Sequence, residues 1–186
     1  MSRLRFDTAQ DVFEAFPSAR GDIEAAPTAD KPLDYLNKLS ASESPEDAVS
    51  FSAYVLGRRE AVWWACQCVR KIAPLVAAEE EKALLLAEAW VREPEEHRRR
   101  YALDFGLKND HKLAGVWVAL AAGGAGGTLV MGENTGPPVP PEMTARATRT
   151  AVLVALARTD PRERLKYIKA CADLCRSLAQ DSEKAT

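Results

Sequence analysis

Apolar residues recur every three or four positions along most of the chain, and this spacing predicts α-helices. The most apolar case in the first half of the chain is residues 58–73, where the stripe is widened by two adjacent tryptophans. A helix that is apolar over most of its circumference usually lies at the centre of a fold. No stretch alternates apolar and polar residues over a strand's length, so no strand is predicted.

Caps, prolines and glycines mark the ends of the predicted helices. Asp7 as N-cap with Gln10 at the third helical position resembles a capping box, and Pro17 ends the helix that follows. Ser44 followed by Pro45 and two acids is a strong helix start. Helices are expected near residues 7–16, 32–39, 45–56, 58–73, 77–92, 94–106, 111–122, 142–158 and 161–180.

These helices predict an all-α fold, a compact and irregular multi-helix bundle with a long Gly/Pro-rich loop at 123–141. Diverged helical-hairpin repeats are the alternative, because similar strings begin at Ala61, Gly115 and Ala151. The offsets between these strings differ, 54 and then 36 residues, which favours the irregular bundle.

The pattern also predicts how the chain is organised. Residues 1–16 form a tethered amphipathic helix, 17–31 a linker rich in Pro, Ala, Gly and charge, 32–180 the helical domain and 181–186 a polar tail. The apolar face of the first helix must cover something, either its own domain or a partner, and the sequence leaves this choice open. Its side chains are therefore candidates for binding a partner: Val12, Phe13 and Phe16.

Composition narrows the class of protein. The 186 residues include 25 Lys and Arg against 27 Asp and Glu, a net charge of −2 that argues against a nucleic-acid binder. With no apolar secretory segment after the first residues, and four cysteines without a disulfide-scaffold spacing, a cytoplasmic location is expected. The uncharged stretch from 113 to 131 offers a membrane alternative, but its glycines favour a buried helix that runs into a loop.

No catalytic, metal or cofactor site is predicted. Cys66 and Cys68 lie about 200° apart around one helix, whereas Cys171 and Cys175 share a face but lack further ligands. The glycine run at 123–128 follows a helix and precedes no lysine, unlike a phosphate-binding loop.

The alternative hypothesis places a ligand pocket among the tryptophan-bearing helices. Its candidate residues are Arg58, Arg59, Trp63, Trp64 and Trp117, with Glu60, Asn109 and His111 as further polar groups.

Three features taken together resemble a known family: the string from Arg59 to Cys68, Ala89-Trp90-Val91 before Pro94, and the glycine loop that leads into the prolines at 137–141. The chain resembles, over about residues 30–180, a family of uncharacterised and mostly proteobacterial proteins sometimes found beside type VI secretion genes. The resemblance implies a cytoplasmic accessory, adaptor or chaperone-like role and carries no catalytic residue.

The function predicted from these features is a non-enzymatic interaction module with a protein partner. The alternative is a small-ligand-binding protein or an enzyme with its pocket among the tryptophan-bearing helices. The oligomeric state is left open.

Overall fold

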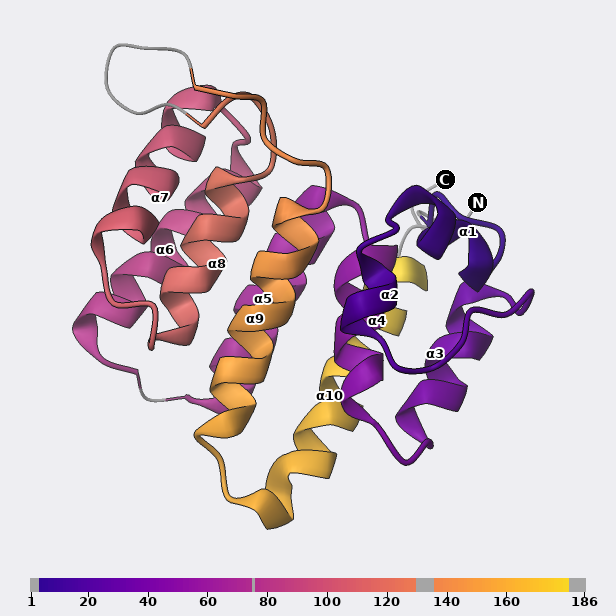
Figure 1. Ribbon diagram of the computed structural model, residues 1–186. Coiled ribbons are helices and arrows are strands. Elements are labelled where there is room, and N and C mark those ends of the chain that lie inside the picture. The colour runs from indigo at the N-terminus through magenta and orange to yellow at the C-terminus, as the bar shows by residue number, and fades with distance from the viewer. Residues whose placement is uncertain (1–3, 75, 130–135, 181–186) are drawn as a thin grey trace.

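The fold is all-α, as predicted (Figure 1). The computed structural model describes residues 4–74, 76–129 and 136–180, and these contain ten helices and no strand. The predicted polar tail, 181–186, lies outside the described residues. The helices are α1 Ala9–Ala15, α2 Ala19–Asp22, α3 Pro32–Ser40, α4 Glu46–Val55, α5 Arg58–Ile72, α6 Ala78–Arg92, α7 Glu96–Lys108, α8 Ala114–Gly123, α9 Met143–Ala157 and α10 Pro161–Gln180.

The first helix begins one residue later than its sequence pattern predicts. Thr8 is the N-cap, its hydroxyl accepts a hydrogen bond from the Asp11 N–H, and the Asp11 carboxylate accepts one from the Thr8 N–H at 2.8 Å. The capping box is therefore present, with Thr8 and Asp11 in the roles predicted for Asp7 and Gln10.

Two groups of helices flank a central pair (Figure 1). Helices α6, α7 and α8 stand on one side, α1 to α4 stand on the other, and α5 and α9 lie between them. The long α10 packs against α3, α4 and α5. Because α5 and α9 contact both groups, they form the centre of the molecule, as the apolar surface of α5 predicts.

Helix α8 packs very closely against α6 and α7. A Cβ atom on Gly115 would stand 2.6 Å from the Glu80 carbonyl oxygen, and one on Gly123 would stand 2.5 Å from the Leu103 Cβ. The uncharged stretch at 113–131 is thus mainly a ten-residue buried helix and the loop after it, with residues 130 and 131 outside the description. Across the described residues, no helix has both the length and the apolar character of a membrane span.

The N-terminal helix is docked on the chain itself, which differs from the predicted tethered helix. Val12 and Phe13 are fully buried, and the Phe13 ring packs against Tyr35 and Phe51 with centroids 6.3 and 6.5 Å away. The face that was predicted to bind a partner is covered by α3 and α4, because these helices carry aromatic residues at matching positions.

The predicted linker, 17–31, is also held in place. It contains the short helix α2, and the Asp47 carboxylate accepts hydrogen bonds from the Glu24 and Ala25 N–H groups at 3.1 and 2.9 Å. The Tyr35 hydroxyl donates to the carbonyls of Ala25 and Ala26. These contacts give the segment a fixed path, so residues 4–31 pack as part of the helical domain.

Arginine side chains hold the described part of the glycine-rich loop. Arg58 Nη1 donates to the Ala125 carbonyl at 3.0 Å, and the buried Arg99 donates to the carbonyls of Gly123 and Thr128. Gly127 has a φ of 68°, and a Cβ there would stand 2.9 Å from Arg99 Nη2. A glycine is needed at this position because the backbone is left-handed and the guanidinium fills the space.

Candidate functional site

A groove opens where the first turn of α5 meets the last turns of α6 and α10. Its volume is about 390 Å³. Three of its lining residues, Arg59, Glu60 and Trp63, lie on α5 and were named from the sequence. We call it the Trp63 groove, and its full lining is Arg59, Glu60, Trp63, Val91, Arg92 and Leu178.

The two adjacent tryptophans of α5 have opposite environments. Trp63 faces the groove with 36% of its surface exposed, whereas Trp64 is fully buried. The Trp64 indole N–H donates to the Cys171 carbonyl at 2.9 Å, which ties α5 to α10. Neighbours on a helix point about 100° apart, so one tryptophan anchors the core and the other is available to a ligand.

The Arg59 side chain is fixed by backbone groups of α6. Its Nε donates to the Val91 carbonyl at 2.6 Å and its Nη2 to the Arg92 carbonyl at 3.2 Å. These carbonyls belong to the last turn of α6, where no further turn of helix supplies an N–H partner. Arg59 therefore caps α6, and its position at the groove is set before any ligand arrives.

Glu60 and Arg92 set the charge of the groove. Glu60 is the third residue of α5, and its Oε2 lies 2.5 Å from where a Cβ on Gly57 would stand, so its carboxylate turns back over the start of α5. The Arg92 side chain is 73% exposed, and its one ion pair among the described residues is with the Glu88 carboxylate, at 3.9 Å. Glu88 is bonded more closely to Arg70, at 2.7 Å.

A second groove, of about 280 Å³, lies between α8 and α9 and contains Trp117. Trp117, Leu120 and Met143 give it apolar walls, and Glu142 and Arg146 are its charged residues. The Trp117 indole N–H donates to the His111 carbonyl at 2.8 Å. We call it the Trp117 groove; it shares no lining residue with the Trp63 groove.

The remaining residues predicted for a pocket or a partner lie elsewhere. Arg58 holds the glycine-rich loop, and Trp64 is in the core. Phe16 is half-buried, with its ring centroid 5.5 Å from that of Tyr54. The Asn109 side chain donates to the Phe105 carbonyl, and the His111 ring is bonded to the Gly106 carbonyl. The predicted single pocket is thus divided between two grooves, the core and a loop contact.

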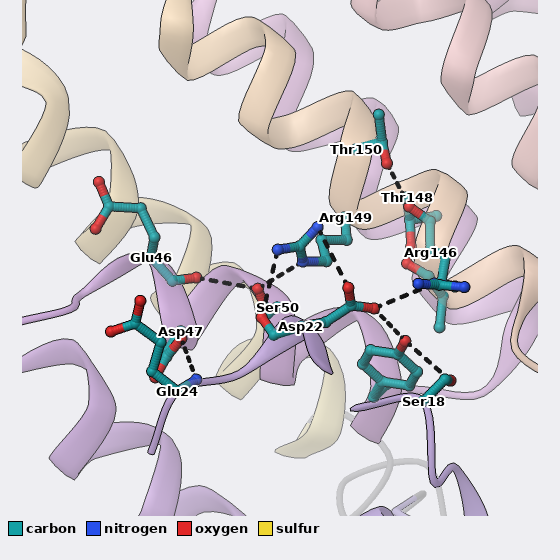
Figure 2. Close-up of polar contacts among 12 residues, drawn as sticks. Ser18, Asp22, Glu24, Glu46, Asp47, Ser50, Arg146, Thr148, Arg149 and Thr150 are labelled. Carbon is teal, nitrogen blue, oxygen red and sulfur yellow. Dashed lines mark hydrogen bonds and ion pairs between the residues drawn. The ribbon is translucent and has the colours of Figure 1, made fainter. Parts of the chain in front are cut away.

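A polar network that the sequence did not indicate joins α2, α4 and α9 (Figure 2). The Asp22 carboxylate, only 9% exposed, accepts hydrogen bonds from the Tyr54 hydroxyl at 2.5 Å and from Arg146 Nε at 3.3 Å. Arg149 is 3.7 Å from the same carboxylate and also donates to the Ser50 hydroxyl at 2.8 Å. Burial and then the bond to Asp22 raise the pKa of Tyr54 to about 12, so its hydroxyl stays protonated and donates.

The four cysteines are free thiols buried in the core. Burial raises the pKa of Cys175 to about 12 and raises the pKa values of Cys66 and Cys68 as well. A protonated and inaccessible thiol is a poor nucleophile and a poor metal ligand. Within the described ranges, no three His, Cys, Asp or Glu residues are placed to hold a metal ion.

The groove residues that the sequence did not reveal come from neighbouring helices. Val91 and Arg92 end α6 and Leu178 lies near the end of α10, so their approach to Trp63 depends on how these helices pack against α5. The spacing along α5 indicates that Arg59, Glu60 and Trp63 lie near one another. It does not indicate which residues of other helices pack beside them.

Comparison with known proteins gives a family and no further match. No curated protein and no solved structure matches the chain. The model of a family of unknown function, DUF6931, matches residues 35–179, which is most of the sequence and includes both grooves. The chain therefore belongs to the family of unknown function DUF6931.

Proposed function

We propose that this protein is a non-enzymatic interaction module that binds a partner protein through the Trp63 groove. The observation that carries the proposal is the partly exposed Trp63 side chain beside Arg59, whose guanidinium is already fixed by hydrogen bonds to the end of α6. Tryptophan and arginine are the residue types that most often dominate binding energy at protein interfaces. A side chain that is fixed in advance loses little entropy when a partner binds.

The side chains that could react chemically are buried or already paired within the protein, and this supports binding over catalysis. The thiols are buried, and the fully buried Glu80 carboxylate is paired with Arg158 at 3.1 Å and with the Gly115 N–H at 3.1 Å. The His111 ring is bonded to a backbone carbonyl. These groups serve packing and helix ends, whereas the Trp63 groove presents apolar and cationic surface.

The proposal includes an adaptor, accessory or chaperone-like role in the cytoplasm of a bacterium. The resemblance described from the sequence supports a bacterial source and a partner associated with type VI secretion. Four reduced thiols fit a reducing compartment.

Site-specific photo-crosslinking tests the proposal directly. A photoreactive phenylalanine analogue is placed at position 63 of the full chain, which is expressed in the cells that naturally make it. We expect an ultraviolet-dependent adduct with one protein at position 63. The matched control is position 85, because Leu85 is an apolar residue 49% exposed on α6 and outside the groove. Equal adducts at both positions, or none at either, would overturn the proposal.

The small-ligand alternative finds its best support in the Trp117 groove, where apolar walls meet Glu142 and Arg146. Ligand pockets commonly combine apolar walls with a few polar groups. A thermal-shift screen of metabolites separates the two functions: a hit that is lost in Trp117→Ala but retained in Trp63→Ala favours the alternative.

A further inference from the structure

We infer that the Trp63 groove recognises a short segment of the partner in which a large apolar side chain stands beside an aspartate or glutamate. This inference rests on the proposed function and adds the chemistry of the partner. It follows from the size, the floor and the charge of the groove.

The size and the floor define the apolar half of the segment. Trp63, Val91 and Leu178 supply apolar surface from three different helices. A volume of about 390 Å³ is near the lower end of ligand pockets, roughly 300–1,000 Å³. Such a space accepts one or two large side chains, so the contact is made by a short segment instead of a whole helix face.

The charges at the groove define the acidic half. Arg59 uses Nε and Nη2 for the α6 carbonyls, and no contact is found for its Nη1 among the described residues. In the part of the chain that the structure describes, Arg92 has only a distant contact with Glu88, whose carboxylate is paired with Arg70. Among the described residues, the one carboxylate lining the groove, on Glu60, turns toward the start of α5. Within the described part of the chain, two cations therefore face the ligand without a close carboxylate between them, and an acidic side chain complements them.

Peptide selection on the full-length protein tests this inference. A phage-displayed library of random peptides of about twelve residues is selected on the immobilised wild-type protein. We expect the enriched peptides to carry Asp or Glu next to an aromatic or large aliphatic residue. The affinity of a synthetic enriched peptide is then measured by fluorescence anisotropy.

Variants at exposed positions separate charge from folding. Arg92→Gln is expected to weaken binding about threefold, because it removes one exposed charge pair. Arg92→Glu is expected to weaken it about tenfold, because it also adds repulsion of the acidic residue. Trp63→Ala is expected to weaken it about thirtyfold, as for an interface anchor. Lys169→Glu on α10 is the matched control, since it makes the same change of charge at an exposed position outside the groove and should alter binding less than about twofold.

Each outcome has a distinct meaning. Trp63-dependent peptides without an acidic residue, or with unchanged affinity for Arg92→Glu, overturn the inference and leave the proposed function standing. Recovery of no Trp63-dependent peptide counts against both. Loss of affinity in Arg92→Glu, retention in Lys169→Glu, and unchanged thermal melting of both variants support the inference.

Discussion

Replacement of Phe13 by alanine measures whether α1 belongs to the core. The Phe13 ring is 1% exposed, packs against Tyr35 and Phe51, and has the Arg20 guanidinium 5.8 Å from its centroid. Removing a buried phenylalanine side chain costs about 3–5 kcal/mol, which includes the lost transfer energy and the cavity left behind. We therefore expect Phe13→Ala to lower the free energy of unfolding by about 4 kcal/mol.

The size of the effect can be stated as a melting temperature. For 186 residues the entropy of unfolding is about 0.4 kcal/mol per kelvin near 60 °C. A loss of about 4 kcal/mol then lowers Tm by about 10 °C, which circular dichroism at 222 nm follows through the helical signal. Glu14→Ala is the control, because Glu14 lies on the exposed face of the same helix.

The result that would refute this reasoning is a Tm for Phe13→Ala within about 2 °C of the Tm for Glu14→Ala. It would mean that α1 is not docked on α3 and α4 in solution. The tethered helix predicted from the sequence would then be the better description, and Val12, Phe13 and Phe16 would again be candidates for partner binding.

Four further predictions follow from other contacts. Asp22→Asn should lower the free energy of unfolding by about 1–3 kcal/mol in denaturant titrations, because two arginines and a buried tyrosine lose a charged partner, whereas Arg162→Gln, at an 87% exposed side chain, should change it little. Gly123→Ala should cost about 1–3 kcal/mol by overpacking against Leu103, while Gly21→Ala, with nothing within 4 Å of the new methyl, should be neutral or stabilising by up to about 1 kcal/mol. Hydrogen bonds from Arg99 hold the pKa of Glu96 at about 2, below its ordinary value of 4.5. The contribution of Glu96 to stability is therefore present above pH 4.5 and is lost as the pH falls toward 2. Glu96→Gln should make the free energy of unfolding less dependent on pH between these two values. Ellman's reagent should modify none of the four cysteines in the native protein at neutral pH and all four after denaturation, and rapid native modification would contradict their burial.

Local signals were enough to predict most of the helices. The helix predicted at 58–73 matches α5 to within one residue at its end, and the helix predicted at 161–180 has the same bounds as α10. Helix α2 was missed because it has four residues and no side-chain cap at Ser18. Most of the other helix ends differ from the predicted ends by one to three residues, because backbone and tertiary contacts outweigh the local pattern there. At the start of α4, for example, the Ser44 hydroxyl donates to Glu24 instead of capping the helix.

The candidate site was predictable only along α5. The i, i+4 spacing of Arg59 and Trp63 places them on one face, and this part of the groove could be named from the sequence. Which of Trp63 and Trp64 faces outward depends on α10, whose Cys171 carbonyl binds the Trp64 indole. Whether α1 covers its own domain or a partner stayed open for a similar reason. An amphipathic pattern shows that one face of a helix is covered, but it does not identify the surface that covers it.

The pairing of Asp22 with α9 also determines when, during synthesis of the chain, the fold can be completed. Asp22 is 124 residues before Arg146 and 127 before Arg149. At a synthesis rate of about 5–20 residues per second, roughly 6–25 s pass between the synthesis of Asp22 and the synthesis of the two arginines. Late in that interval Tyr54, which donates to the Asp22 carboxylate, has been made, but α9 has not. The faces of α4 and α5 that α9 covers therefore lack this partner helix. The nascent chain thus has a defined period in which a holding factor would protect it, and that period ends when α9 is complete.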